Sequence, residues 1–250
     1  MKSNWTIKKL SDIAEFNPKE RLSKGTIAKK IAMDKLQPFC RDVPEYEKVA
    51  FTGGTKFRNG DTIMARITPC LENGKIAKVD ILDDDEVGFG STEYIVFRAK
   101  QEVDEDYLYY LVCSPEVREP AIKSMVGSSG RQRVQTDVVQ NLDISVPPYS
   151  VQKAIGATLK IIDDKIALNN KINDNLEQQA VTVFRSWFTS FSQSESINKK
   201  SSEFGDIPVN FSIVKVGSLP MLVTDYVANG SFASLKENVT LYQEPNYVCL

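Results

Sequence analysis

The sequence has 250 residues, of which 42% are apolar and 26% are charged, so it can bury one or two globular cores and is not expected to be disordered. Its net charge of −2 excludes a protein that binds polyanions over its whole surface, although a local basic patch is compatible with it. The sequence contains no histidine, which excludes Ser-His-Asp and Cys-His catalytic sites and removes the commonest zinc ligand.

The sequence shows no targeting signal and no metal-binding motif. The N-terminal stretch lacks the apolar region of a signal peptide, and no apolar run approaches the roughly 20 residues needed to cross a bilayer. The cysteines are scattered without a Cys-x-x-Cys pair, at Cys40, Cys70, Cys113 and Cys249. We therefore expect a cytoplasmic protein with free thiols, no metal site and no membrane association.

The first part of the chain, residues 1–148, has the texture of an α+β domain. Its apolar stretches are short, rich in β-branched residues and broken by Gly, Pro and Asp, which is typical of short strands. Strands are predicted at 62–67, 75–79 and 92–97, and helices at 105–112 and 115–125. Residues 57–61 predict a turn that leads into a strand, and Asn73-Gly74 predicts a hairpin turn.

A long helix is predicted over residues 149–191. Pro147-Pro148 ends the preceding element, Ser150 is the expected N-cap, and the rest of the segment contains no proline and only Gly156 as a glycine. Seam positions recur at alternating steps of four and three, which is the heptad pattern of a coiled coil. They are Ile155, Leu159, Ile162, Ile166, Asn169, Asn173, Leu176, Ala180, Val183 and Trp187. At 1.5 Å per residue such a helix extends about 60 Å.

Two polar residues interrupt this seam at its middle. A buried asparagine in a coiled coil costs stability but fixes register, because it needs a hydrogen-bonding partner. We favour this interpretation for Asn169 and Asn173; the alternative is a curved or broken helix in which both face water. A second apolar stripe, Ile161, Leu168 and Ile172, is expected to pack against the N-terminal domain or against a second partner helix.

The last part of the chain contains a short internal repeat. Residues 192–203 are polar and predict a linker. Residues 4–13 (NWTIKKLSDI) match residues 210–219 (NFSIVKVGSL) in their pattern of asparagine, aromatic, hydroxyl, isoleucine, lysine and aliphatic positions. Residues 204–250 are therefore interpreted as the truncated start of a second copy of the first domain.

This order of elements resembles the specificity subunit of type I restriction–modification enzymes. The family commonly closes a recognition domain with Leu-x-Ile-x-Pro-Pro and then Glu-Gln-x-x-Ile. Residues 142–155 (LDISVPPYSVQKAI) match this pattern, with Val151 where glutamate is usual. Further segments similar to the family are 162–173 and 184–188 in the spacer helix, 60–75 and 127–134 in the recognition domain, and 224–232. The usual subunit has two complete recognition domains and two long helices, whereas this sequence has one of each and a fragment.

The resemblance implies a target-recognition domain that binds double-stranded DNA. In the family two long helices pair antiparallel and hold two recognition domains over a split target, and the subunit directs methyltransferase subunits and a restriction/translocase subunit to that target. With a single helix present, we expect a homodimer formed through it. No cofactor is expected on this chain, since S-adenosylmethionine, ATP and Mg²⁺ would belong to the partner subunits.

Two segments carry the chemistry for DNA contact. Arginine can bind guanine and glutamine can bind adenine through paired hydrogen bonds, and glycines permit close approach to phosphate. The predicted groove contacts are Arg131, Gln132 and Arg133; the predicted phosphate or base contacts are Ser128, Arg66, Thr68, Asn73 and Lys75. Alternatively, the Gly-Ser-Arg loop is only solvated, and Arg66 forms a salt bridge with Glu72 or Glu93. The acidic runs 83–86 and 102–106 are expected to be solvated faces.

Two catalytic readings and one structural reading compete with DNA recognition. An adenine methyltransferase would need Asn or Asp before Pro-Pro-Tyr, and the sequence has Val146 there, so we expect no catalytic residue. No cluster of paired carboxylates with lysine supports a nuclease. The remaining alternative is a coiled-coil scaffold or inhibitor that binds methyltransferase subunits without reading DNA.

Overall fold

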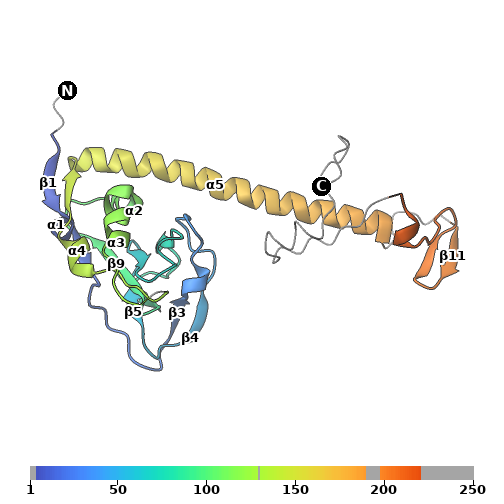
Figure 1. The fold of residues 1–250 in the computed structure, drawn as a ribbon, viewed down its shortest axis with the longest axis horizontal. Helices are drawn as coiled ribbons and strands as arrows, with labels where there is room; N and C mark the ends of the chain where they lie inside the picture. Colours follow the sequence, from blue (N-terminus) through green and yellow to red (C-terminus); the bar gives the residue numbers. More distant parts are fainter. Residues whose placement is uncertain (1–3, 129, 190–197, 221–250) are drawn as a thin grey trace, which may run out of the picture. The chain divides into compact units, whose positions relative to one another are not determined.

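The computed structural model describes residues 4–128, 130–189 and 198–220. It divides into two compact units, residues 1–176 (unit 1) and 177–250 (unit 2), which are described separately. Figure 1 shows the chain coloured along the sequence. The segment 224–232 and Cys249 lie outside the described residues, while Cys40, Cys70 and Cys113 are free thiols.

Unit 1 contains two four-stranded sheets and a two-stranded ribbon. The antiparallel central sheet has the order β2 (Ala14–Phe16), β9 (Tyr94–Ala99), β6 (Thr62–Ala65) and β7 (Ile76–Lys78). The outer sheet has the order β4 (Glu47–Ala50), β3 (Ile27–Ile31), β8 (Gly88–Gly90) and β5 (Thr55–Phe57), with β3 and β8 parallel. The ribbon pairs β1 (Thr6–Lys9) with β10 (Asp143–Val146), so the two ends of the domain sequence meet.

The central sheet is buried on both faces because its strands are apolar at consecutive positions. On β9, Ile95 and Phe97 face one core, and Tyr94 and Val96 face the other, as expected for the two-residue period of a strand. The first core is closed by helices and the second by the outer sheet. The helices are α1 (Leu10–Ile13), α2 (Glu105–Cys113), α3 (Pro115–Lys123) and α4 (Thr136–Gln140); a 3₁₀ turn, η1, covers Met33–Lys35.

The predicted α+β fold with a long helix is confirmed, as are the strands at 62–67, 75–79 and 92–97 and the two helices that follow them. The tight Asn-Gly hairpin turn is wrong. Gly74 does have a positive φ of 71°, but the Ala65 amide donates to the Lys75 carbonyl, so the connection between β6 and β7 is the whole loop 66–74. A two-residue Asn73-Gly74 turn would have required the strand pairing to continue up to Glu72 and Lys75.

The long helix α5 runs from Tyr149 to Phe184 and has 36 residues. It begins one residue before Ser150, so Ser150 lies in the first turn and is not the cap. A π-helical turn, η2 (Arg185–Thr189), follows Phe184, and the last two residues of the predicted helix, 190 and 191, lie outside the described residues. Among the described residues, no helix is both long and apolar enough to cross a membrane.

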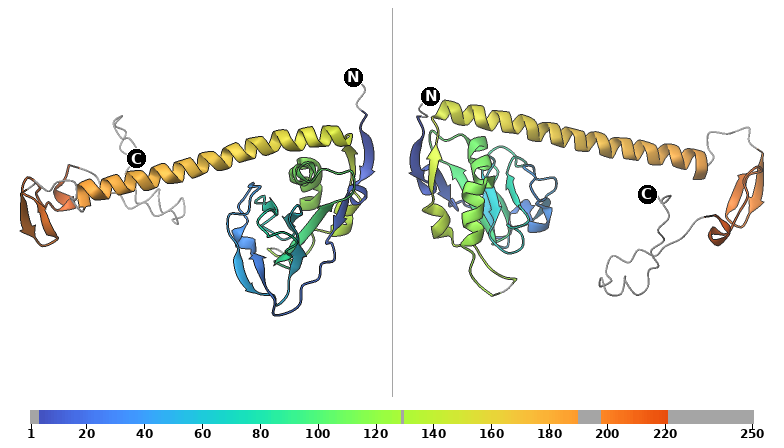
Figure 2. Two further views of the ribbon diagram at one scale, coloured as in Figure 1. Left: turned by 180° about the vertical axis from the view of Figure 1, so that it is seen from behind. Right: turned by 45° about the horizontal axis from the view of Figure 1, so that its top comes forward.

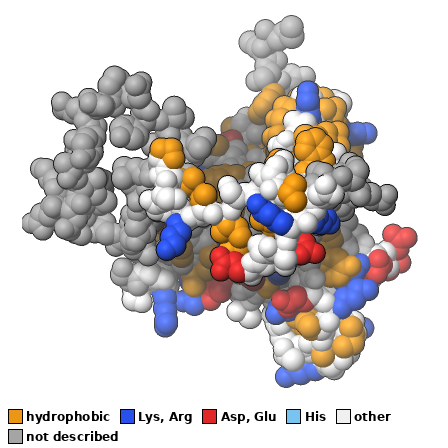
Figure 3. Space-filling view, turned by 90° about the vertical axis from the view of Figure 1, so that its right-hand side faces the viewer, with side chains coloured by type: hydrophobic (Ala, Val, Ile, Leu, Met, Phe, Trp, Pro, Cys, Tyr) orange, Lys and Arg blue, Asp and Glu red, His pale blue; other side chains and the backbone are white. Residues whose placement is uncertain are grey.

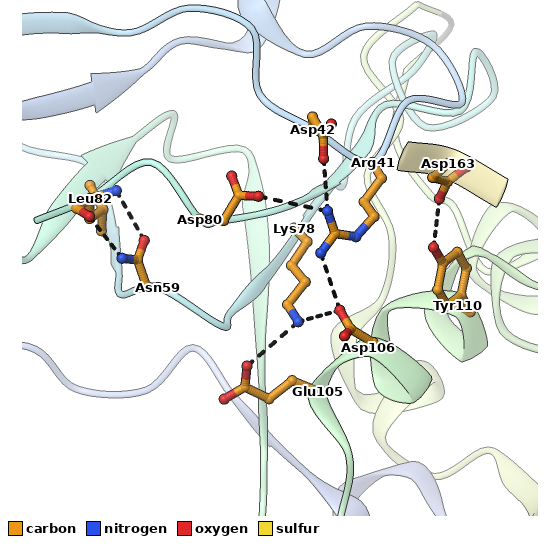
Figure 4. A network of polar contacts seen from close by, with 10 residues as sticks. All are labelled: Arg41, Asp42, Asn59, Lys78, Asp80, Leu82, Glu105, Asp106, Tyr110 and Asp163. Atoms are coloured by element: carbon orange, nitrogen blue, oxygen red, sulfur yellow. Dashed lines mark hydrogen bonds and ion pairs between the residues drawn. The ribbon is translucent and has the colours of Figure 1, made fainter. Parts of the chain in front are cut away.

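The first turns of α5 are fixed to the domain by specific contacts. The buried Gln152 side chain accepts from the Asp104 amide at 3.1 Å and donates to the Pro147 carbonyl at 2.9 Å. Gly156 lets the helix approach closely, since a Cβ there would lie 2.6 Å from Asp104 Oδ1. Figure 4 shows the last of these contacts, in which Asp163 of α5 accepts a 2.7 Å hydrogen bond from the Tyr110 hydroxyl of α2.

The helix seam is covered only at its beginning. Ile155 packs against the first core and Leu159 is half-buried, whereas the larger apolar seam residues from Ile162 onward are half exposed or more. Asn169 and Asn173 are also exposed in this single chain. The second stripe does not pack against the N-terminal domain as one alternative held, because Ile161 is 67% and Leu168 57% exposed. That stripe lies on the side of the helix opposite Gln152 and Gly156.

In unit 2 the described residues form a hairpin of β11 (Lys199–Ser202) and β12 (Gly205–Pro208), followed by a 3₁₀ turn, η3 (Val216–Ser218). The predicted linker 192–203 is therefore too long at its C-terminal end, because its last residues pair as a strand; residues 190–197 are outside the description. In the repeat, η3 falls where α1 falls in the first copy. No strand matches β1, because β1 forms by pairing with the distant β10 and no described segment of unit 2 offers a counterpart.

Candidate nucleic-acid interface

Several loops meet where the strands of the two sheets end. β6 and β8 finish at this edge, while β5 and β9 begin there, so the connections 52–54, 66–75 and 91–93 are brought together. The Arg66 amide donates to the Glu93 carbonyl at 2.9 Å, which ties two of these loops. This edge therefore gathers residues that are far apart in the sequence.

The loop 126–133, between α3 and α4, is attached to the same edge. The amides and carbonyls of Val126 and Arg133 exchange hydrogen bonds of 3.1 and 2.9 Å, and Arg133 also bridges to Ile67. On the other side the Thr68 amide donates to the Gln132 carbonyl at 3.0 Å. Figure 2 (right) shows this loop projecting from the body of unit 1, with its base held by backbone pairing. Ser129 lies outside the described residues.

The tip of the loop presents the predicted groove residues to solvent. Its backbone is turned by a 3.0 Å hydrogen bond from the Arg131 amide to the Ser128 carbonyl, and Gly127 and Gly130 adopt positive φ angles. Ser128 and Arg131 are exposed and Gln132 is half-buried. The side chains of Arg131 and Gln132 form no hydrogen bond or ion pair with the described residues, so their donors remain available to a ligand.

Arg133 differs from Arg131, because a carboxylate already engages it. Its Nε lies 3.0 Å from both carboxylate oxygens of Glu93, and its Nη2 lies 2.6 Å from Oε1. The hydrogen bonds from Arg133 lower the pKa of Glu93, and Glu93 in turn raises the pKa of Arg133. This pair cannot be found from the sequence alone, since the two residues lie 40 positions apart and the fold brings them together, in part through the bridge between Ile67 and Arg133.

Arg66 and Thr68 lie at the base of the loop and have structural partners. Arg66 donates from Nη2 to the Val134 carbonyl at 3.1 Å, while its buried Nε has no partner among the described residues. It forms no ion pair within 4 Å with Glu72 or Glu93, so that alternative for Arg66 is wrong. The Thr68 hydroxyl donates to Met125 Sδ at 3.4 Å.

Asn73 and Lys75 lie at the other end of the loop 66–75, away from the tip of 126–133. Lys75 donates from Nζ to the Met33 carbonyl at 2.8 Å, and the Asn73 amide donates to the Pro69 carbonyl while its side chain is exposed. Arg118 of α3 holds this end by donating to the Glu72 carbonyl at 2.7 Å. The structure thus brings the predicted residues of 126–133 together with Arg66 and Thr68, but not with Asn73 and Lys75.

The acidic runs are more than solvated faces. Asp83 and Glu86 both lie 3.0 Å from the ammonium of buried Lys29. Figure 4 shows Asp106 accepting from Lys78 and Arg41, at 2.5 and 3.2 Å. These carboxylates neutralise buried cations of unit 1 and are not free to oppose a nucleic acid.

The surface charge is mixed. Figure 3 shows basic, acidic and apolar side chains interspersed on the face that it presents, as the net charge of −2 leads one to expect. Within the part of the chain that the structure describes, no group of three or more Cys, Asp or Glu residues could hold a metal ion. The arrangement is therefore one of hydrogen-bond donors on a supported loop, which suits recognition of a polar ligand.

Comparisons with known proteins give relatives of one kind. The chain is 33% identical over 184 residues to the type I restriction enzyme EcoAI specificity subunit of Escherichia coli, covering 71% of this chain and 30% of that protein. It is 31% identical over 153 residues to the HindI specificity subunit of Haemophilus influenzae, covering 60% of this chain and 31% of the relative. The chain therefore spans about a third or less of these curated relatives.

Fold and family comparisons agree with these relatives. The solved HsdS subunit from Thermoanaerobacter tengcongensis matches with a TM-score of 0.55 at 18% identity, over 73% of this chain and 48% of that one, which shows a common fold. Residues 2–178 match the type I restriction modification DNA specificity domain, a description that agrees with a recognition component and not with an enzyme. This match covers most of the sequence, and the chain belongs to the family of type I restriction modification DNA specificity domains.

Proposed function

We propose that this chain is a DNA-recognition component of a type I restriction–modification system, and that the loop 126–133 reads base edges in the major groove. The observation that carries the proposal is the combination of a backbone fixed at both sides of the loop with two unengaged side chains, Arg131 and Gln132, at its end. A supported loop holds its donors in place before the ligand arrives, which reduces the entropy lost on binding.

The chemistry of these two residues suits base readout. The guanidinium of arginine can donate two hydrogen bonds to guanine O6 and N7, and the amide of glutamine can pair with adenine N6 and N7. Each such pair discriminates against a wrong base by about 1–3 kcal/mol. Arg133 can contribute only where a phosphate or base competes with Glu93, so its role is secondary to that of Arg131.

The partners follow from the family. The relatives are named as specificity subunits of type I restriction enzymes. We infer that this chain directs methyltransferase and restriction/translocase subunits to its target, and that those subunits bind S-adenosylmethionine, ATP and Mg²⁺. The chain itself would supply hydrogen bonding and shape, with no bond-making step of its own.

A second copy of the chain is the partner that the helix seam fits. In an antiparallel pair centred between Asn169 and Asn173, each of these residues lies opposite the other from the second copy. The same alignment places Ile166 against Leu176 and Ile162 against Ala180, so every exposed seam position of α5 meets another seam position. The resulting two-fold dimer would hold two recognition domains over a symmetric split target.

The first experiment measures DNA binding with Arg131→Ala and Gln132→Ala variants of the full chain. Duplexes selected from a random pool by the wild-type chain are compared with random duplexes by fluorescence anisotropy. We expect each variant to lose about 1–3 kcal/mol of affinity for the selected duplex, roughly 5-fold to 150-fold, with little loss for random DNA. Lys8→Ala, an exposed cation on β1 at the opposite end of the domain, serves as the control.

Two outcomes would contradict the proposal. Equal binding of selected and random duplexes by the wild-type chain would remove sequence recognition. No binding of any duplex, together with copurification of methyltransferase subunits, would favour the scaffold or inhibitor function. Mapping of methylated sites in cells with and without the chain then distinguishes an active specificity component from an inhibitor.

A further inference from the structure

The loop 126–133 is too weakly basic to hold a DNA duplex by itself. Arg131 has the only guanidinium on this loop that is unengaged by the described residues, because Glu93 binds Arg133. Single DNA-binding modules bury roughly 600–1,000 Å² of protein surface. Half or more of their hydrogen bonds go to phosphate and sugar. A neighbouring surface should therefore supply the phosphate contacts.

One surface of unit 1 is rich in cations and almost free of acidic groups. Residues 17–28 and 50–57 contain a single acidic residue, Glu20. Its side chain is only 8% exposed and lies 2.9 Å from Arg58 Nε and 2.7 Å from Arg98 Nη1, so its charge is neutralised within the fold. The cations of these two segments are Lys19, Arg21, Lys24 and Lys56. Lys19 and Lys56 line an open depression that we call the basic groove, and Arg21 and Lys24 follow Lys19 along the chain.

The basic groove is an open depression of about 460 Å³ between residues 17–20 and 54–56. Lys56 is held at its wall, since its ammonium donates to the Glu20 carbonyl at 3.0 Å and lies 5.1 Å from the centre of the Phe51 ring. Lys19, Arg21 and Lys24 are exposed and form no ion pair with the described residues. The groove therefore has one fixed cation, Lys56, and one exposed cation, Lys19, and two further unpaired cations follow within five residues of Lys19 in the sequence.

The groove continues the edge that carries the loop 126–133. Thr55 pairs with Gly90, and Gly54 approaches so closely that a Cβ there would lie 2.1 Å from the Gly90 carbonyl oxygen. Three residues after Gly90, Glu93 contacts Arg133. Figure 1 shows residues 17–26 passing along the side of unit 1 farthest from α5, and Figure 2 shows the loop 126–133 projecting on that side as well.

The two residues before Gly54, which lines the groove, also offer neutral donors. The amides of Thr52 and Gly53 form no hydrogen bond with the described residues, and the Thr52 side chain is exposed. Backbone amides and hydroxyls are common phosphate ligands beside lysine and arginine. Exposed lysines alone are usually only solvated. Here the missing counter-charges, the groove and the free amides occur together next to the recognition loop.

We propose that the basic groove binds the phosphate backbone of duplex DNA beside the bases read by the loop 126–133. This inference rests on the proposed DNA-binding function and adds a site that carries affinity without sequence preference. Each phosphate neutralised by a cation releases counterions, so the contacts of the groove contribute to the salt dependence of binding.

The test compares two triple variants of the full chain that remove the same charge. The first is Lys19→Ala, Arg21→Ala, Lys24→Ala. The control is Lys8→Ala, Lys100→Ala, Lys153→Ala, whose side chains lie on β1, after β9 and on the first turns of α5, away from the groove. All six side chains are exposed, and circular dichroism melting verifies that both variants are folded.

The groove variant should bind selected and random duplexes about tenfold or more weakly at 0.1 M salt, with the ratio between them unchanged. Its plot of log affinity against log salt concentration should be shallower by about 2 to 3, near 0.9 for each lost contact. A Lys19→Arg, Lys24→Arg variant, which keeps all three positive charges, should bind DNA as tightly as the wild-type chain. Inorganic phosphate at matched ionic strength should not displace the duplex.

The inference is overturned if the groove variant matches the control variant in affinity and salt slope, or if it loses selectivity without losing affinity. If inorganic phosphate competes with DNA, the groove is a small-anion site and not a duplex site. If the groove variant binds like the control variant while Arg131→Ala still weakens binding, only the groove proposal is overturned. A wild-type chain that binds no duplex overturns the proposed function as well.

Discussion

Glu93 strongly affects the net charge at the edge of unit 1 to which the loop 126–133 is attached. It is the carboxylate that binds Arg133, and its backbone carbonyl also accepts from the Arg66 amide. A negative charge beside the loop weakens attraction for any duplex, which limits binding at sites that offer no base contacts. The number of arginines at this edge therefore does not give its net positive charge, because carboxylate partners cancel part of that charge.

This role predicts the effect of Glu93→Gln. Removing the carboxylate charge frees Arg133, so affinity for random duplexes should rise by roughly threefold to tenfold and depend more steeply on salt. Affinity for the selected duplex should rise less, so the ratio between the two should fall. Anisotropy titrations at several salt concentrations measure both quantities.

The control for this prediction is Asp164→Asn, an exposed carboxylate on α5. It removes the same charge without releasing an arginine of the loop. Unchanged or weaker binding of random DNA by Glu93→Gln would show that Glu93 only supports the loop and does not restrain its charge.

At the scale of elements, the docking of α5 determines where the helix leaves the domain. Gln152, Gly156 and Asp163 recur on one face at steps of four and seven, and each contacts α2 or the turn before it. Only the first four turns or so have such contacts. The rest of the helix exposes its apolar side chains, as expected for an element completed by another chain.

Gly156→Ala tests this docking because two effects have opposite signs. Alanine in place of glycine favours an isolated helix by about 1 kcal/mol. Here the new Cβ would lie 2.6 Å from Asp104 Oδ1 and 2.9 Å from the Tyr107 amide, so the helix has to shift. We expect a net loss of about 1–3 kcal/mol in the free energy of unfolding, measured by urea denaturation.

Asn170→Ala, at an exposed position of the same helix beyond the contacts with α2, is the matched control, and its effect should stay within about 0.5 kcal/mol. A stabilising Gly156→Ala would mean that the contact with Asp104 yields easily and that the helix is not fixed to unit 1 at this point.

At the scale of the whole molecule, the alignment of the two α5 helices in the proposed dimer can be tested with pairs of introduced cysteines. In the antiparallel pair, Asn169→Cys on one chain should form a disulfide with Asn173→Cys on another when the two variants are mixed and oxidised. Neither variant should link to itself, since position 169 lies opposite 173. Mass spectrometry of the linked peptides identifies the pairing among the native cysteines.

The control is Lys171→Cys, which points to the opposite side of the helix from the seam and should not link. Efficient self-linking of Asn169→Cys would indicate a parallel pair. A strictly monomeric chain in light scattering at high concentration, with no other subunit present, would exclude the homodimer.

The periodic and local features of this protein could be predicted from its sequence. The heptad pattern and the Pro147-Pro148 junction predicted α5, and the β-branched runs predicted β6, β7 and β9, because apolar periodicity and β-branched composition are properties of each segment's own sequence. The motifs between 142 and 155 likewise indicated the family, which the match over residues 2–178 confirmed.

Tertiary structure decided the features that depend on distant residues. The sequence could not reveal that Glu93 neutralises Arg133, that Asp163 fixes α5 through Tyr110, or that Lys19 lies across a groove from Lys56. Each arises where strands from different parts of the chain end at one edge or pack across a sheet. Charge and hydrogen bonding act through space over a few ångströms, so the identity of a partner is fixed only when the fold brings it within reach.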